Sequence, residues 1–283
     1  AQGGIACVMD DDDTFDEHVY DTMVAGCHLN KEDVVRTIIE DGPARIQDLL
    51  DTGVQFTRRA ELEEGAKKSG TDPLDFDLGR EGGHRKRRIL HSGDYTGREM
   101  IRAVHKACLD HPKIDLREGC HAVDLIASRR LGWDGPNMCL GAWVMDRETN
   151  AVDTYLAKHT ILATGGAGKA YLYTSNPDVA CGEGVAMAYR AYAEIANMEF
   201  FQFHPTCLFH PRAKNFLVTE ACRGEGGILR TLAGEAFMER YHPLKDLAPR
   251  DVVARAIDSE LKRSGDLHVL LDMTHLPAEM LTD

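Results

Sequence analysis

A first apolar stripe lies between Asn30 and Leu50. Behind Asn30, a residue type that caps helix N-termini, apolar residues recur at helical spacing at Val34, Val35, Ile38 and Ile39. The pattern predicts an amphipathic helix that stops near Gly42 and Pro43. A second helix is predicted from there to Leu50, ended by Gly53.

A second stripe follows Thr96. Thr96 and Glu99 have the spacing of a capping box, and Ile101, Val104 and Cys108 then fall on one face. We therefore expect a helix over 97–109. Helices are also predicted over 182–194 and 251–262, the second of them closed by Gly265.

Short runs rich in apolar and β-branched residues predict strands between these helices. They cover 114–117, 122–127, 140–145, 152–156, 160–163, 198–203 and 267–272. The run 160–163 looks buried and leads directly into a glycine-rich turn. Strands that alternate with helices favour an α/β fold. The polar stretch 58–83 is predicted to be a long mobile loop, and loops of that length are usually functional lids or disordered.

Composition narrows the class of protein. The 283 residues are 43% hydrophobic and 28% charged, which suits one large domain or a main domain with a smaller one. A net charge of −13 makes nucleic acid and anionic membranes poor partners. No apolar run reaches the length of a membrane helix, and no export signal is visible. Eight cysteines without a C-x-x-C pair favour a reducing cytoplasm. The chain starts without methionine, and both ends look internal.

Two charged runs have a simple interpretation. The acidic run 10–13 is predicted to be a solvated turn. The basic run 85–88 would suit nucleic acid in isolation. On an acidic chain, a solvated loop whose partner lies on the same protein is favoured instead.

The segment 163–168 is the first candidate site. Glycines after a strand let backbone N–H groups approach a phosphate or a ring system, although a tight turn explains them equally well. The spacing is not the G-x-G-x-x-G of a dinucleotide fingerprint.

His204 ends an apolar run, where it can donate to an anionic ligand or satisfy a backbone carbonyl. His210 does not complete a metal site, because no third ligand is at hand.

Further candidates are charged. Thr219, Glu220 and Arg223 stand beside the glycine loop 224–227, where they can grip a polar ligand or form salt bridges with one another. Arg250 begins a predicted helix, where a cation opposes the helix dipole unless an anion is bound nearby. Arg250 is therefore a candidate for recognising a carboxylate. Glu81 precedes two glycines, at a hairpin tip or in a ligand-facing loop.

The order of these pieces resembles the succinate dehydrogenase and fumarate reductase flavoprotein family. The segments that carry the resemblance are 1–5, 81–84, 88–91, 94–99, 163–166, 202–206, 219–226 and 248–257, and the likeness extends over essentially the whole chain. The E-G-G-H-x-x-R-R-I-L-H loop at 81–91 favours the branch of the family that oxidises L-aspartate.

The resemblance implies a fold and its domains. Residues 1–197 would be part of an α/β, Rossmann-like FAD-binding domain whose G-x-G-x-x-G segment precedes Ala1, and 198–283 would begin an α+β capping domain that continues past Asp283. The active site would lie between the two, and closure of the cap would exclude water.

The resemblance also assigns residues to a non-covalently bound FAD and to a dicarboxylate. The cofactor set is Gln2, Gly3, Gly4, Val123, Thr164, Gly165 and Glu183, the last standing where the family usually has aspartate. The substrate set is His204, Thr219, Glu220 and Arg250. The catalytic set is Arg250, His204 and Glu81, with Glu81 facing the substrate ammonium. No metal is implied.

The implied activity is oxidation of L-aspartate to iminoaspartate, with oxygen or fumarate as electron acceptor, in the first step of quinolinate and NAD synthesis. A quinolinate synthase is a possible partner, and the location would be cytoplasmic. Two alternatives stay open: a succinate dehydrogenase or fumarate reductase flavoprotein subunit, and a truncated remnant without catalytic activity.

Overall fold

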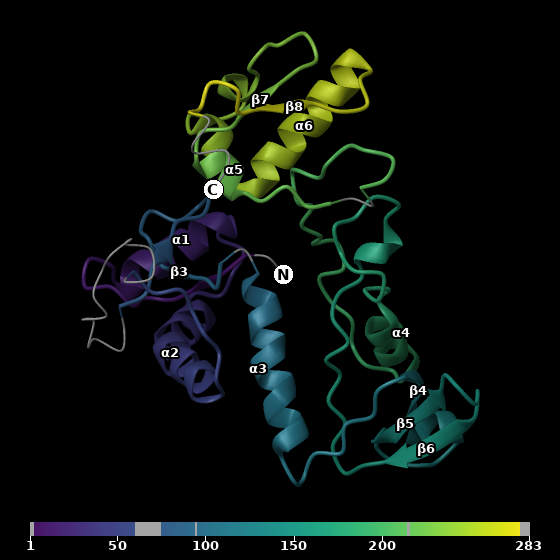
Figure 1. Cartoon of the computed structure of the whole chain (residues 1–283). Coiled ribbons are helices and arrows are strands. Elements are labelled where there is room, and N and C mark those ends of the chain that lie inside the picture. Colours follow the sequence, from purple (N-terminus) through teal and green to yellow (C-terminus); the bar gives the residue numbers. More distant parts are fainter. Residues whose placement is uncertain (1–2, 60–74, 94, 214–215, 278–283) are drawn as a thin grey trace. The chain divides into compact units, whose positions relative to one another are not determined.

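The computed structural model describes residues 3–59, 75–93, 95–213 and 216–277 and has a mixed α/β fold (Figure 1). The chain divides into two compact units, one of residues 1–114, 204–206 and 217–283, the other of 115–203 and 207–216. We call them unit 1 and unit 2. The domain boundary expected near residue 197 stays a prediction.

Unit 1 begins with a small antiparallel sheet in the order β1-β3-β2, covered by helices. Its elements are β1 (Ile5–Ala6), α1 (Phe15–Ala25), α2 (Glu32–Asp51), β2 (Leu78–Gly79), β3 (Ile89–Leu90) and α3 (Thr96–Asp110). The core under the sheet contains Cys7, Ile46, Val54, Phe56, Phe76, Leu78, Leu90 and Ala103. A Cβ on Gly4 would stand 2.2 Å from the Leu90 carbonyl oxygen, so β1 approaches β3 this closely only with glycine at that position.

Helix α2 is continuous, so the predicted break at Gly42 and Pro43 is wrong. Proline inside a helix loses one hydrogen bond, but Ile39 and Ile46 on either side of Pro43 are buried and hold the helix together by packing. The predicted cap at Asn30 is also wrong. The Asn30 side chain instead donates to the Thr22 carbonyl at the end of α1, 3.1 Å away.

Helix α3 confirms the helix predicted over 97–109, but not its capping box. Thr96 lies inside the helix, where its hydroxyl accepts from the Ser92 N–H. The Glu99 carboxylate accepts from the Gln55 N–H at 2.9 Å, a contact 44 residues distant in sequence. The spacing suits a capping box, but Thr96 bonds to the preceding turn and Glu99 bonds to a distant part of the chain.

Strands β2 and β3 are joined by a hairpin, residues 79–88. It is closed by the Arg88 N–H, which donates to the Gly79 carbonyl at 3.2 Å, while the Arg88 carbonyl accepts from Cys7 on the β1 side at 2.9 Å. The loop predicted over 58–83 lies mostly outside the described residues, at 60–74. The prediction of a loop is wrong at Leu78 and Gly79, because these two residues form strand β2 and pair with β3.

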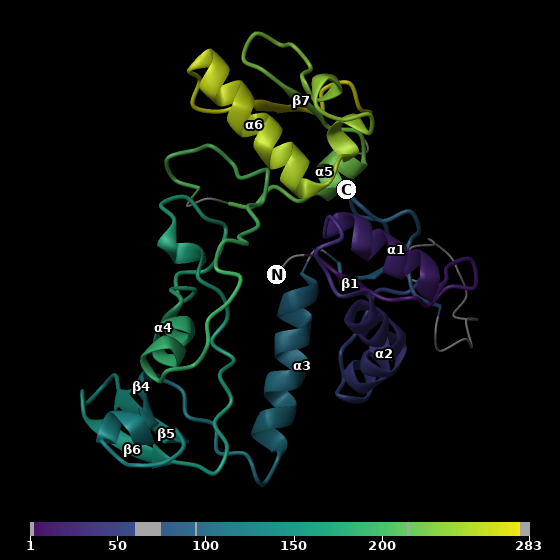
Figure 2. The same ribbon diagram turned by 180° about the vertical axis from the view of Figure 1, so that it is seen from behind.

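The rest of unit 1 packs helix α6 on a two-stranded sheet (Figure 2). Its elements are α5 (Ala221–Gly224), β7 (Ile228–Arg230), α6 (Arg250–Ser264) and β8 (Leu270–Asp272). Val253 and Ala256 of α6 are buried against Leu229 and Phe237. Helix α6 confirms the prediction over 251–262, and Gly265 ends it in the left-handed conformation at φ +79°. Strand β8 confirms the second half of the run 267–272.

Unit 2 contains an antiparallel meander, β4 (Cys120–Ala127), β5 (Cys139–Asp146) and β6 (Val152–Leu156), with α4 (Glu183–Arg190) against β4. These elements confirm three predicted strands and the core of a predicted helix. The strands predicted over 114–117, 160–163 and 198–203 are wrong. Ile161 is 88% exposed, because an apolar run becomes a strand only beside a partner strand, and the described residues offer it none.

Candidate functional site

Arg250 stands between two carboxylates of unit 1. It is the first residue of α6, and its Nη2 donates to Glu81 Oε2 at 3.0 Å while its Nε donates to Glu220 Oε2. The Glu220 side chain is buried, whereas those of Arg250 and Glu81 are 33% and 31% exposed. These two carboxylates are the nearby anions that a cation at a helix N-terminus requires, and solvent still reaches the guanidinium.

A second arginine lies behind Glu220. Arg223 is fully buried on the same helical turn, its Nη2 lies 3.4 Å from Glu220 Oε1, and its Nη1 donates to the Asp246 carbonyl at 2.7 Å. Its Nε and Nη2 have no hydrogen-bond partner among the described residues. Burial lowers the pKa of Arg223. The sequence marks Arg223 as a charged candidate beside Glu220, but the substrate set implied by the resemblance leaves it out; its position three residues after Glu220 puts both on one face of a helical turn.

Glycine backbone brings the hairpin and the Glu220 turn together. A Cβ on Gly82 would stand 2.4 Å from Glu220 Oε1, and one on Gly3 would stand 3.3 Å from Glu81 Oε1. Thr219 is exposed immediately before Glu220. The structure therefore gathers Gly3, Glu81, Glu220 and Arg250 although they are far apart in the sequence.

His204 lies near the same cluster. Its Nδ1 is 2.9 Å from the Thr206 carbonyl oxygen, and burial, followed by the positive charge of Arg250 among other charges, holds the pKa of His204 below its ordinary value. The imidazole is therefore neutral at pH 7. The Thr206 N–H also donates to Nδ1, at 3.2 Å, so in one tautomer Nδ1 accepts and Nε2 carries the proton that can be donated to a carboxylate. In the other tautomer Nδ1 donates to the Thr206 carbonyl, and the ring must gain a proton before it can hold a carboxylate.

The formal charges of the cluster balance. Two carboxylates, Glu81 and Glu220, face two guanidiniums, Arg223 and Arg250, and His204 is neutral. A neutral cluster with an exposed carboxylate beside an exposed guanidinium suits a ligand that carries charges of both signs.

The remaining cofactor candidates lie in unit 2, while Gln2 lies outside the described residues. Val123 falls at a β-bulge of β4 and has no partner in β5, and its carbonyl accepts from Arg190 Nη2 of α4 at 3.5 Å. Gly165 has φ +73°, and a Cβ added to it would meet nothing within 4 Å, which leaves room for close approach of a ligand. Thr164 packs on Gly184 of α4, and Glu183 begins that helix. Open glycine backbone of this kind fits a flat cofactor, and the cofactor roles stay predictions.

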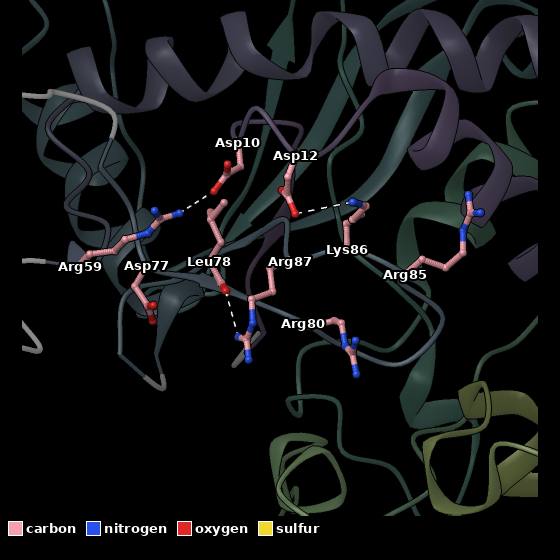
Figure 3. Close-up of a pocket in the computed structure, with 9 residues that line it drawn as sticks. All are labelled: Asp10, Asp12, Arg59, Asp77, Leu78, Arg80, Arg85, Lys86 and Arg87. Carbon is pink, nitrogen blue, oxygen red and sulfur yellow. Dashed lines mark hydrogen bonds and ion pairs between the residues drawn. The ribbon is translucent and has the colours of Figure 1, made fainter.

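A charged pocket of about 570 Å³ lies elsewhere in unit 1 (Figure 3). Ion pairs between Arg59 and Asp10 and between Lys86 and Asp12 neutralise much of its lining, which contains none of the predicted site residues. The part of the chain that the structure describes shows no cluster of metal ligands.

Both charged runs have partners within the chain, as predicted for the basic one, but the prediction that the basic run is solvated is wrong at Arg88, whose side chain is completely buried. The prediction of a solvated acidic turn is wrong for Asp13, whose buried carboxylate pairs with the buried Arg88. Four consecutive aspartates are expected to be exposed to solvent, because carboxylates are strongly hydrated. Asp13 is nevertheless buried, because it pairs with Arg88, 75 residues later in the sequence.

Known proteins resemble this chain along its whole length. A family model described as an FAD binding domain matches residues 1–283. An L-aspartate oxidase of Pseudomonas aeruginosa is 50% identical over 283 residues, covering 99% of this chain and 51% of that protein. The chloroplastic L-aspartate oxidase of Arabidopsis thaliana is 44% identical, with 99% and 42% covered. The solved structure of the E. coli quinol fumarate reductase FrdA matches with a TM-score of 0.83 at 29% identity, covering 99% of this chain and 47% of that one.

The chain spans about half the length of these relatives. No helix within the described ranges is both long and apolar enough to cross a membrane.

Proposed function

We propose a function for this chain from one premise, that it belongs to the FAD-binding-domain family, whose model matches it throughout. The function is FAD-dependent oxidation of L-aspartate to iminoaspartate. The relatives named L-aspartate oxidase at 44–50% identity support this proposal. So does the placement of Glu81 beside Arg250.

The pairing of Glu81 with Arg250 is the observation that carries the proposal. Aspartate has an ammonium next to one carboxylate, and Glu81 and Arg250 offer the complementary charges 3.0 Å apart. Both side chains remain about one-third exposed, so a ligand can insert between them. Succinate has no ammonium and would meet Glu81 as a repelling charge.

In this mechanism the chain binds and orients. Arg250 holds one substrate carboxylate, protonated His204 holds the other, and Glu81 faces the ammonium, so the Cα hydrogen has one fixed direction. Glu220 keeps the Arg250 guanidinium in place from its buried side. Thr219 completes the polar wall next to Glu220. When bound, FAD would accept the hydride removed from Cα, while the substrate nitrogen would lose one proton to free its lone pair and a second to leave the neutral imine.

The test is an anaerobic titration of the FAD-loaded protein expressed from its complete gene. L-Aspartate should bleach the flavin absorbance, whereas succinate should not. Bleaching by succinate alone would refute oxidation of an amino acid and support the dehydrogenase alternative. Protein that holds no flavin would support the non-catalytic alternative.

A fumarate reductase or succinate dehydrogenase flavoprotein is the second candidate function. The similarity to FrdA favours it, as do Arg250 and His204, which suit any dicarboxylate. Glu81 separates the two candidates, because only an amine gains from a carboxylate there. Oxygen or fumarate as acceptor, a quinolinate synthase partner and a cytoplasmic location belong to the proposal for L-aspartate oxidation.

A further inference from the structure

The hairpin 79–88 carries Glu81 and is anchored on its far side by buried charge. Arg88, at the hairpin's end, is completely buried, and so is the Asp13 side chain before α1. Asp21 within α1 is also buried and accepts from both Arg85 and Arg88. Burial raises the pKa of Asp21, but the hydrogen bonds from both arginines outweigh it, so the net pKa falls and the carboxylate stays charged.

Every nitrogen of the Arg88 guanidinium is engaged. Nε and Nη2 donate to the two oxygens of Asp13, both at 2.7 Å, and Nη1 donates to Asp21 at 2.8 Å. Nη1 also lies 3.4 Å from Nδ1 of His84, whose pKa is lowered by burial and by the charge of Arg88. The neutral imidazole can therefore accept a hydrogen bond from Arg88.

A short path leads from this guanidinium to the site. The backbone N–H of His84 donates to the backbone carbonyl of Glu81 at 3.2 Å, and this hydrogen bond closes the turn that carries Glu81. The backbone of Arg88 closes the other end of the hairpin at Gly79. The Arg88 backbone thus closes the base of the hairpin, while its side chain docks the hairpin on Asp21 of α1 and contacts the His84 ring.

Stability alone is a weak explanation for such an arrangement. The desolvation of buried ion pairs offsets most of their attraction, and apolar residues of similar size often replace them without loss. A bidentate pair does fix direction, because the planar fork of arginine matches a carboxylate in one orientation. The network is therefore suited to holding the hairpin in one position.

We propose that Arg88 is the positioning residue for Glu81, and that it sets the preference of the site for dicarboxylates that carry an amine. The inference rests on the proposed function and deepens it. Arg88 does not touch the substrate. It acts through the hairpin, so its loss misplaces Glu81 and leaves Arg250 and Glu220 where they are.

The test compares two ligands that bind without reacting. 2-Methyl-L-aspartate has no hydrogen on the carbon that bears nitrogen, so it cannot be oxidised to the imine, and 2-methylsuccinate is its partner without the amine. Dissociation constants are measured by calorimetry on the FAD-loaded protein from the complete gene. In Arg88→Met, affinity for the amine ligand should fall by about tenfold or more while that for 2-methylsuccinate stays within about twofold. Arg88→Lys, which keeps the charge without the fork, should fall between.

Two further variants make the result interpretable. Asp21→Asn removes one anchor with little change in shape and should give a smaller selective loss, and it carries the test if Arg88→Met does not fold. Arg240→Met breaks a different ion pair, to the buried Glu260, and should leave the ratio of the two affinities unchanged.

Equal loss of both ligands in Arg88→Met and Asp21→Asn would overturn the inference, because it would mean a general structural role. Unchanged binding of both would overturn it as well. A wild-type protein that binds 2-methylsuccinate but not 2-methyl-L-aspartate would instead refute the proposed function, and this inference with it.

Discussion

Replacing Glu81 by glutamine should separate amine recognition from carboxylate recognition. Glutamine keeps the shape of the side chain and can still pack in the hairpin, but it removes the negative charge 3.0 Å from Arg250 Nη2. The substrate ammonium loses its counterion. The guanidinium loses a competitor for the substrate carboxylate.

The size of the effect follows from the geometry. Two unit charges about 4 Å apart attract by about 4 kcal/mol at an effective dielectric constant of about 20. The Glu81 side chain is 31% exposed, and solvent screening together with desolvation of the ammonium removes about half of this. About 2 kcal/mol remains, or roughly thirtyfold in affinity for L-aspartate. Affinity for succinate should stay level or rise by roughly threefold, because a like charge has gone.

The assay is the rate of anaerobic flavin bleaching against L-aspartate concentration, with succinate as a competing ligand. Wild type and Glu81→Gln are compared in the FAD-loaded protein from the complete gene. A thirtyfold rise in the half-saturating concentration of aspartate, with an unchanged or lower inhibition constant for succinate, fits the reasoning. Equal weakening of both ligands, or no change for aspartate, would refute Glu81 as the partner of the ammonium.

Three further predictions follow from the same geometry. Arg250→Leu should reduce turnover by about a thousandfold while bound FAD, measured by absorbance, stays at the wild-type level, and near-normal turnover would contradict its role. Because the pKa of His204 lies below its ordinary 6.5 in the free site and a bound carboxylate favours the protonated ring, ligand binding should take up a proton. Succinate affinity should then fall, by at most about tenfold per pH unit, between the pKa of His204 in the free site and its pKa in the bound site, and calorimetry in two buffers would show no proton uptake in His204→Gln. Gly4→Ala should lower the free energy of unfolding, measured by thermal denaturation, by about 1–3 kcal/mol, because the added Cβ would stand 2.2 Å from the Leu90 carbonyl oxygen. Gly79→Ala on the same sheet is the control and should change it much less, because the nearest atom to its added Cβ is 3.7 Å away.

Elements with local causes were predictable from the sequence. The apolar faces of α3 and α6 repeat within the helix itself, and β4, β5 and β6 pair with their neighbours in the chain, so a short window contains the necessary information. The run 160–163 failed for the opposite reason. Its residue types suit a strand, but a strand also needs a partner, which no local pattern supplies.

The candidate site divides in the same way. Arg250, Glu220 and Glu81 stand out by residue type and local setting, and the structure brings them together. Their contacts span 30 and 169 residues, so proximity could be inferred only from a resemblance. The buried pair of Asp13 and Arg88 was not foreseen at all, because composition alone places four aspartates in water.

The anchoring of the hairpin also bears on the order in which the protein folds. Asp13 and Asp21 leave the ribosome before Arg88, which follows them by 75 and 67 residues. Until then two carboxylates that belong in the interior, Asp13 before α1 and Asp21 within it, have no partner arginine, and the β1–β3 pair has no second strand. Closing so long a loop is slow, since the entropy is lost before the contact forms. The segment that carries Glu81 is therefore among the last parts of its sheet to reach its final place, so substitutions at Arg88 should speed unfolding more than they slow folding.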